Sequence, residues 1–498
     1  MQHWKKIFRL PSKPSVHMLP VVAGAVIMSA CATDPSLAPR KPSGFPASVE
    51  KIIVPKCAIS GCHNTESRDA ASGLALETWD QLFEGTRDNS AVVPFRPDFS
   101  FLMFFVNTYS DLGPSIIPTM PLDEAPLTRD EVTTLRDWIL AGAPNDKGEV
   151  MFSGDPDRKK VYVFNQGCDN VAVIDAATNL IMRYVDIGHD VAIESPHRAL
   201  ISPNGKYFYV CYTAGQYFQK YSTEDESLAG EVNLGTGNWN SFAISDDGSK
   251  AYVIDWSANG TIAVVDLINM KVLVHYKGSG LFQWPHGSAM RDVNTLYVTA
   301  QTGNFMYKID VSNLSSPDIE EIILQPGEPK TVAPKYDPHD VRFSPDRSQY
   351  AVTCQKSNEV RFFNSNNDQL IATVPVGTYP QEIEFSTSTD YVFVSCMEDQ
   401  TTTPGKRGSV AVINYKTHAL VKLVYTGFQP HGLIPDDEKQ WVYVANRNAV
   451  SDGPAPHHTT ECGGRNGYLT ILDMNTLELV PGYKAELSVD PYAVVIRE

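Results

Sequence analysis

The feature that most constrains the fold is a strand pattern that recurs seven times between residues 158 and 498. Each copy contains a run rich in Tyr and Val, and a second apolar run that commonly ends in Asp or Asn follows it. The Tyr/Val runs are Val161–Val163, Phe208–Val210, Ala251–Val253, Leu296–Val298, Tyr350–Val352, Val392–Val394 and Val442–Val444. Repeats of several short strands separated by turns predict a β-propeller, in which neighbouring blades bury one another.

The chain ends on a strand without a partner in its own repeat, residues 491–496. We expect this strand to complete the opening blade, because that pairing closes the ring and removes exposed sheet edges. The repeat pattern resembles the YVTN family of seven-bladed propellers. The resemblance implies an all-β, seven-bladed propeller over residues 158–498.

One position of the repeat aligns around the predicted ring and is unusually rich in histidine. Histidine accounts for only 12 of 498 residues, yet four of these seven positions are histidine, far above chance. Because the position begins the expected innermost strand, we predict that the side chains converge at one mouth of the central channel. The seven residues are His197, Asn240, His286, His339, Gln381, His431 and Tyr492.

Two interpretations of these four histidines, His197, His286, His339 and His431, remain open. As neutral imidazoles they suit copper, iron or zinc, or a second haem, and they are then also candidate catalytic residues. Alternatively, each makes a local hydrogen bond where its strand enters the blade. A second cluster of His457, His458 and Cys462 lies in the insertion from residue 446 to 467. It predicts either a copper site or cover for the channel mouth, or else a solvated loop.

Cys57, Cys62 and His63 form a candidate haem-attachment motif, Cys-Ala-Ile-Ser-Gly-Cys-His. In c-type cytochromes two thiols bond to the haem and the histidine after the second thiol binds the iron. The usual spacing places two residues between the cysteines, whereas this motif has four. A zinc knuckle or a disulfide could use the same pair, although no second cysteine pair completes four zinc ligands.

The residues around this motif follow an ordered pattern. A helix is expected at residues 48–55, and Met120 lies between prolines in a loop. Thr128 and Glu131 form a capping box. The helix that follows has apolar residues at helical spacing and ends before Gly142: Val132, Leu135, Trp138 and Ile139.

This order resembles the class I-like cytochrome c domain of bacterial fusion proteins and implies a small all-α domain over residues 47–148. The resemblance further implies one haem c, attached through Cys57 and Cys62, with His63 proximal and Met120 distal to the iron. Met103 is a rival distal ligand. With both axial positions filled, this haem would carry electrons and bind no substrate.

Residues 1–30 have the organisation of an export signal. A positive leader is followed by an uncharged stretch from Met18 to Ala30, which is too short to span a bilayer. Its end resembles the bacterial lipoprotein box, which implies lipidation of Cys31. Residues 31–46 then read as a tether. We therefore expect a lipid-anchored protein of the cell envelope, with the residues after Cys31 favouring the outer membrane.

Composition and cysteine placement narrow the functions further. A formal charge of −17 argues against nucleic acid as a partner, since a phosphate backbone requires clustered Lys and Arg. Export permits disulfides, but we expect the cysteines near the strands to be small buried hydrophobes: Cys168, Cys211, Cys354 and Cys396.

The expected order of a haem domain and a propeller is similar to that of cytochrome cd1 nitrite reductase, and a histidine-lined propeller is similar to nitrous-oxide reductase. These resemblances imply electron transfer with a redox partner protein or a small-molecule donor or acceptor. If the protein is an enzyme, it is then an oxidoreductase. The alternative is a propeller that docks a ligand or protein and carries an accessory haem without catalysis.

Overall fold

The computed structural model describes residues 42–456 and 462–498. Ser43–Glu498 form one compact unit that consists mostly of strands, with few helices. Among the described residues, no helix has the length and apolar character needed to cross a membrane. The expected signal peptide, Cys31 and the tether up to residue 41 lie outside the described residues, so these predictions are not tested.

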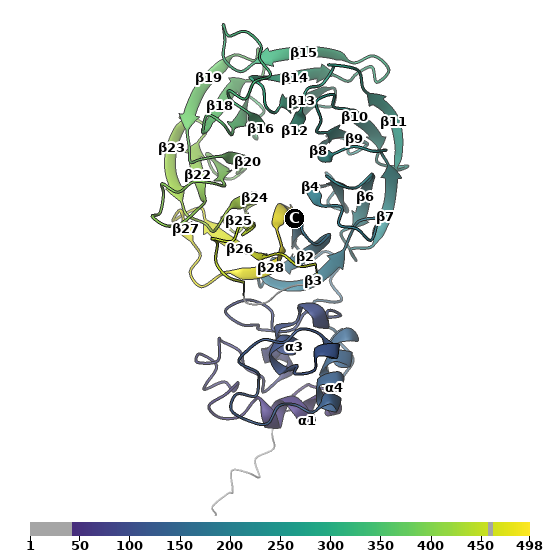
Figure 1. Ribbon diagram of the computed structural model, residues 1–498, viewed down its shortest axis with the longest axis vertical. Coiled ribbons are helices and arrows are strands. Elements are labelled where there is room, and N and C mark those ends of the chain that lie inside the picture. Colours follow the sequence, from purple (N-terminus) through teal and green to yellow (C-terminus); the bar gives the residue numbers. More distant parts are fainter. Residues whose placement is uncertain (1–41, 457–461) are drawn as a thin grey trace, which may run out of the picture. The chain divides into compact units, whose positions relative to one another are not determined.

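Seven antiparallel sheets surround a central axis, and Figure 1 shows the first strand of each sheet nearest to that axis. The sequence prediction of a seven-bladed β-propeller is therefore confirmed. The second strands are almost fully buried because each lies between neighbouring blades. β5 is one example, whereas the outermost strand of the same blade, β7, is largely exposed.

The first four blades contain the following strands, ordered from the axis outward. Blade 1 contains β29 (Pro491–Arg497), β1 (Lys160–Asn165), β2 (Asn170–Asp175) and β3 (Leu180–Asp186). Blade 2 contains β4 (Pro196–Ile201), β5 (Tyr207–Tyr212), β6 (Tyr217–Ser222) and β7 (Leu228–Asn233). Blade 3 contains β8 (Trp239–Ile244), β9 (Lys250–Asp255), β10 (Ile262–Asp266) and β11 (Lys271–Tyr276). Blade 4 contains β12 (Pro285–Asp292), β13 (Thr295–Ala300), β14 (Phe305–Asp310) and β15 (Asp318–Ile323).

The remaining three blades follow the same order. Blade 5 contains β16 (Pro338–Phe343), β17 (Gln349–Cys354), β18 (Glu359–Asn364) and β19 (Leu370–Pro375). Blade 6 contains β20 (Pro380–Phe385), β21 (Tyr391–Cys396), β22 (Ser409–Asn414) and β23 (Ala419–Val424). Blade 7 contains β24 (Pro430–Asp436), β25 (Trp441–Asn446), β26 (Asn466–Asp473) and β27 (Glu478–Leu479), and β28 (Ala485–Val489) also pairs with β26.

The C-terminal strand closes the ring as expected. β29 pairs antiparallel with β1, and Tyr162 lies opposite Val495 in the register. The last strand thus provides the inner edge of blade 1, while the rest of that blade comes from the start of the propeller. This closure leaves β1 with a partner on each side, which removes an edge open to unwanted pairing.

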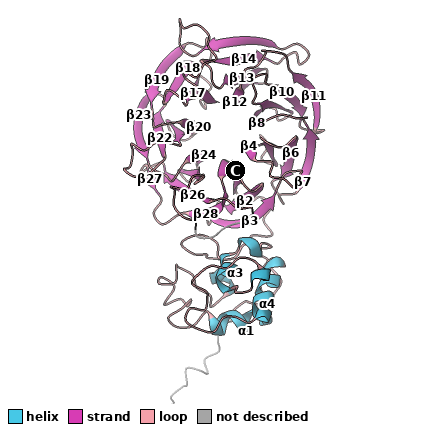
Figure 2. Ribbon diagram, viewed as in Figure 1, coloured by secondary structure: helices cyan, strands magenta, loops and turns pink. Residues whose placement is uncertain are grey.

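The segment before the propeller contains the helices of the structure (Figure 2). They are α1 (Ala47–Lys56), α2 (Trp79–Leu82), α3 (Phe101–Val106) and α4 (Arg129–Leu140), with 3₁₀ turns η2 (Pro97–Phe99) and η3 (Ser110–Leu112). The expected first helix is α1. The expected capping box is present at Thr128 and Glu131, where α4 begins. The four apolar residues predicted along α4 are buried.

The helical segment and blade 1 share one hydrophobic core, which includes Val49 and Val171. Polar side chains of the segment also satisfy the outer edge of β3. Asn89 accepts the backbone N–H of Ile181 at 2.8 Å, and the Ser90 hydroxyl donates to the Ile181 carbonyl. The sequence-defined segment 47–148 is therefore part of the same compact unit as the propeller.

The end of the expected tether is packed against the helices. Ser43 and Phe45 are buried, and the Phe45 ring packs edge-on against Trp138 of α4. The Ser43 carbonyl accepts the backbone N–H of Trp79 at 2.8 Å. The folded region therefore begins a few residues earlier than residue 47.

Candidate functional site

The residues from Cys57 to His63 form a closed loop after α1. The Cys62 N–H donates to the Ile59 carbonyl and the His63 N–H donates to the Cys57 carbonyl, both at 3.0 Å. The turn within the loop accommodates the two extra residues of the motif. Cys57 is buried and Cys62 is exposed, and both are free thiols. Burial, and next the nearby Cys62, raise the pKa of Cys57 to about 11, so its sulfur is protonated at neutral pH.

His63 is held so that one ring nitrogen remains available. Its Nδ1 lies 3.4 Å from the Leu74 carbonyl oxygen, which can only accept a hydrogen bond. Burial lowers the pKa of the imidazole, although the hydrogen bond to Leu74 opposes this shift. The neutral ring therefore carries its hydrogen on Nδ1 and has a lone pair on Nε2. A hydrogen bond of this kind orients the ring of a metal-binding histidine.

Met120 lies in a loop, as expected, and the loop is fixed to α3. Its backbone N–H donates to the Phe105 carbonyl at 2.8 Å, and the Ile116 N–H donates to the Phe104 carbonyl at 2.9 Å. The Met120 side chain is half-buried against the shared core, whereas Met103 is a fully buried member of that core. Met103 is thus accounted for by packing, and Met120 is the methionine with accessible surface.

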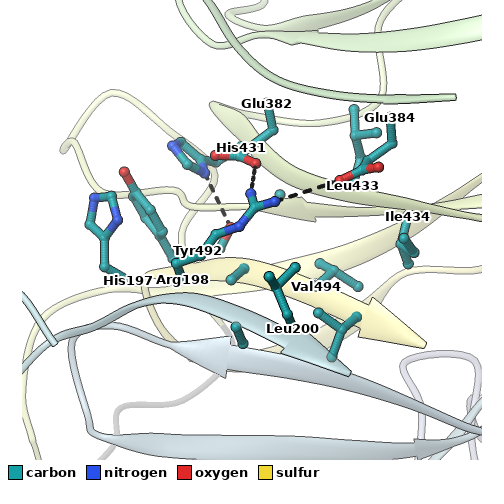
Figure 3. A pocket seen from close by; sticks show the side chains of 14 residues that line it. His197, Arg198, Leu200, Glu382, Glu384, His431, Leu433, Ile434, Tyr492 and Val494 are labelled. Atoms are coloured by element: carbon teal, nitrogen blue, oxygen red, sulfur yellow. Dashed lines mark hydrogen bonds and ion pairs between the residues drawn. The ribbon is translucent and has the colours of Figure 1, made fainter. Parts of the chain in front are cut away.

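The histidines of the repeat converge around the channel axis, as predicted. His197, His286, His339 and His431, together with Tyr492, form a closed circuit of five rings that we call the channel ring. Neighbouring ring centroids lie between 3.6 and 6.0 Å apart. Figure 3 shows three of the five, His197, His431 and Tyr492, beside a small cavity.

Backbone carbonyls of adjacent inner strands hold three of the imidazoles. Nδ1 of His197 lies 2.7 Å from the Asn240 carbonyl oxygen, and Nδ1 of His286 lies 3.1 Å from that of His339. Nδ1 of His431 lies 3.2 Å from the Tyr492 carbonyl oxygen. Burial lowers the pKa of His286 to about 4 and that of His431 to about 3, so both rings are neutral. These three contacts join neighbouring blades, whereas Nδ1 of His339 is buried without a hydrogen-bond partner among the described residues.

The structure provides no preformed metal site in the part of the chain it describes: no group of three or more His, Cys, Asp or Glu side chains there could hold an ion. The channel-ring imidazoles instead contact one another and the backbone. His457 and His458 lie outside the described residues. Metal binding by the six candidate histidines therefore stays a prediction.

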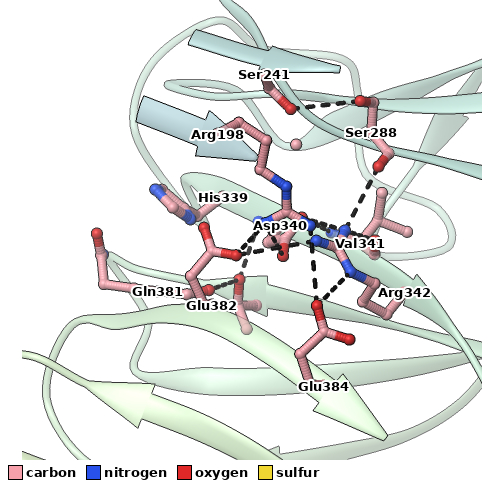
Figure 4. Close-up of polar contacts among 12 residues, drawn as sticks. Arg198, Ser241, Ser288, His339, Asp340, Val341, Arg342, Gln381, Glu382 and Glu384 are labelled. Carbon is pink, nitrogen blue, oxygen red and sulfur yellow. Dashed lines mark hydrogen bonds and ion pairs between the residues drawn. The ribbon is translucent and has the colours of Figure 1, made fainter. Parts of the chain in front are cut away.

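A charged cluster lies in the channel and was not predicted from the sequence (Figure 4). Arg198 on β4 forms an ion pair with Glu382 on β20. Arg342 on β16 bonds Asp340 at 2.8 Å and Glu384 at 3.0 Å. The sequence contains a pattern that could have predicted this cluster, because each of its charged residues follows the aligned ring position by one or three residues. Their meeting depends on blades that are distant in sequence.

The cysteines of the propeller divide into two groups. Cys211, Cys354 and Cys396 are buried free thiols, which confirms their prediction as small hydrophobes. Cys168 corrects that prediction, because it forms a disulfide with Cys462 across a sequence separation of 294 residues. The bond joins the β1–β2 hairpin of blade 1 to the insertion of blade 7, which ring closure makes neighbours.

The fold defines the protein as a seven-bladed β-propeller preceded by a helical segment. No family model matches the chain, and no curated protein matches it. A protein of unknown function from Desulfotomaculum acetoxidans is similar, with a TM-score of 0.50 and 12% identity, over 68% of this chain and 98% of that one. This likeness concerns the fold alone.

Two further solved structures are similar to the chain. Hydrazine synthase from Kuenenia stuttgartiensis has a TM-score of 0.47 and 19% identity over 62% of this chain and 90% of that one. The dihydro-haem d1 dehydrogenase NirN, solved in complex with DHE, has a TM-score of 0.49 and 11% identity over 86% and 97% of the two chains. Neither similarity assigns an activity to this chain.

Proposed function

We propose that the helical segment binds one covalently attached haem c and that the protein transfers electrons in the cell envelope. Cys57 and Cys62 would form the two thioether bonds, His63 Nε2 would bind the iron, and Met120 Sδ would be the second iron ligand. The loop from Cys57 to His63 carries this proposal, since it holds two free thiols beside an imidazole whose Nε2 is available. When bound, the haem supplies a one-electron couple.

Exposed apolar side chains in the Cys57–His63 loop and in the loop around Met120 support the proposal. Ile59, between the two cysteines, is 41% exposed. Ile117 and Leu122, on either side of Met120, are 92% and 54% exposed. Large apolar side chains exposed beside the candidate ligands are available for an apolar group to cover. The faces of a porphyrin are such a group.

Replacing Met120 with His is expected to lower the midpoint potential of the haem. A thioether ligand favours the reduced iron more than an imidazole does. The expected fall is roughly 0.1–0.2 V, part of the about 0.8 V range that axial ligands set. Spectroelectrochemical titration measures it. Met103→Leu is the matched control, because Met103 is buried in the core, and it should leave the potential unchanged. A shift in the Met103 variant alone would reverse the ligand assignment.

We also propose that Cys31 is lipidated and anchors the protein to a membrane surface, where a redox partner protein or a small molecule exchanges electrons with the haem. The Cys168–Cys462 disulfide fits an oxidising compartment. Cys31→Ser should move the protein from the membrane fraction to the soluble fraction, since acyl chains would provide the attachment. Fractionation followed by immunoblotting measures this, and an unchanged membrane fraction would contradict the proposed anchor.

A second candidate function is a docking propeller with an accessory haem. It is favoured by the channel ring, whose imidazoles bond backbone carbonyls and pack on one another, and by the lack of a preformed metal site among the described residues. Metal analysis tests whether the channel adds a redox centre to either candidate. A stoichiometric copper or a second haem would support a redox centre in the channel, whereas iron from one haem alone would support carriage or docking.

A further inference from the structure

The channel cluster contains more acidic than basic groups. Its charged side chains come from β4, β16 and β20, and β8, β12, β24 and β29 contribute serines, imidazoles and a tyrosine. The carboxyl groups outnumber the guanidinium groups by three to two, with side-chain exposures between 3% and 23%: Arg198, Asp340, Arg342, Glu382 and Glu384. A full set of charges would leave one uncompensated negative charge, which is costly in a low-dielectric interior.

The two glutamates of the cluster face the same side of β20 but differ in their partners. Glu382 forms its ion pair with Arg198 directly. Glu384 lies 3.8 Å from Arg198 and shares Arg342 with Asp340. Burial would raise the pKa of Glu382, but Arg198 and the nearby imidazoles lower it to about 2. Burial raises the pKa of Glu384 to about 8, because Arg198 offsets the burial only in part.

Asp340 is the other group that could hold a proton. Burial, and next the Glu382 carboxylate, raise its pKa well above the ordinary range. Asp340 is not among the residues that line the small cavity in the channel, whereas Glu382 and Glu384 both line it. Position therefore favours Glu384 as the group that can exchange a proton with a molecule in the cavity.

One residue that lines the same cavity has an unpartnered hydrogen-bond acceptor. His431 lines it, is 1% exposed, and has its Nδ1 bonded to the Tyr492 carbonyl. A carbonyl oxygen only accepts, so the neutral ring carries its hydrogen on Nδ1 and a lone pair on Nε2. That Nε2 is buried and has no hydrogen-bond partner among the described residues. Because buried polar atoms usually have a hydrogen-bond partner, we expect a molecule in the cavity to bond this nitrogen.

We propose that this cavity binds one small uncharged molecule that both accepts and donates a hydrogen bond. The protonated Glu384 carboxyl donates to the acceptor atom of the molecule, and His431 Nε2 accepts from its donor. The cavity of about 40 Å³ has room for roughly three waters. This site is independent of the proposed haem.

Infrared spectroscopy of the full-length protein tests the proton on Glu384. The carbonyl stretch of protonated carboxylic acids should be present at pH 7, and one component of it should disappear on titration with a midpoint near pH 8. Glu384→Gln should remove that component, and the control Glu320→Gln, at an exposed glutamate of β15, should retain it. A wild-type band without a component that titrates near pH 8, or a component that is lost only in Asp340→Asn, would overturn the assignment.

Formamide is a suitable probe of the cavity, because its carbonyl accepts and its amide donates. A saturable shift of the Glu384 band with added formamide is expected, and His431→Phe should abolish the saturation while the band itself remains. A wild-type band that does not respond to formamide, or a response that His431→Phe leaves intact, would overturn the binding site. The wild-type titration remains informative even if a variant fails to fold.

Discussion

A Cys57→Ser, Cys62→Ser double variant is expected to lose all covalently bound haem. Thioether bonds form only at cysteine sulfur, and the structure leaves these two thiols free within one closed loop. Protein matured in a host with cytochrome c assembly should therefore give no haem-stained band on a denaturing gel. Each single variant should retain at most one thioether.

A Cys211→Ser, Cys354→Ser variant is the control for this experiment. Both thiols are free but buried in the propeller, so they contribute nothing to haem attachment and the haem-stained band should persist. Retention of covalent haem in the Cys57, Cys62 double variant would refute the attachment site.

Gly432→Ala is expected to destabilise the propeller markedly through a single added methyl group. An added Cβ would lie well within contact distance of the Tyr492 carbonyl oxygen and 3.0 Å from Ala493 Cα, both on the closing strand β29. Since backbone atoms cannot move as a side chain can, β24 and β29 would separate. The expected loss in the free energy of unfolding is about 2 kcal/mol, typical of overpacking.

Urea denaturation followed by intrinsic fluorescence measures this loss. Gly278→Ala is the matched control, because its nearest neighbour would be Leu281 Cβ at 3.7 Å, an ordinary contact. Gly432→Ala should unfold at a lower urea concentration than the control. Equal midpoints for the two variants would show that the close approach of β24 and β29 does not limit stability.

The propeller and its channel ring could be predicted from the sequence because both follow from a local repeat. The four histidines occupy the same position in their inner strands. The location of this position in one blade therefore gives its location in the others. The closing strand was also predictable, since residues 491–496 lacked a partner within their own repeat.

The remaining features depend on contacts between segments far apart in sequence. Cys168 and Cys462 become neighbours only when blade 7 meets blade 1, so the local strand pattern wrongly suggested a buried thiol. Arg198 and Glu382 are 184 residues apart and meet across the channel. The packing of Asn89 against the edge of β3 is equally non-local, which is why the sequence suggested a more independent helical domain.

The haem content of the matured full-length protein tests the central claim most directly. A pyridine haemochrome spectrum, combined with the intact mass of the denatured protein and its iron content, counts the covalently bound haem per chain. We predict a Soret band, one iron, and an added mass of one haem that survives denaturation. A correctly matured protein that is colourless, or whose haem is released on denaturation, would contradict the account.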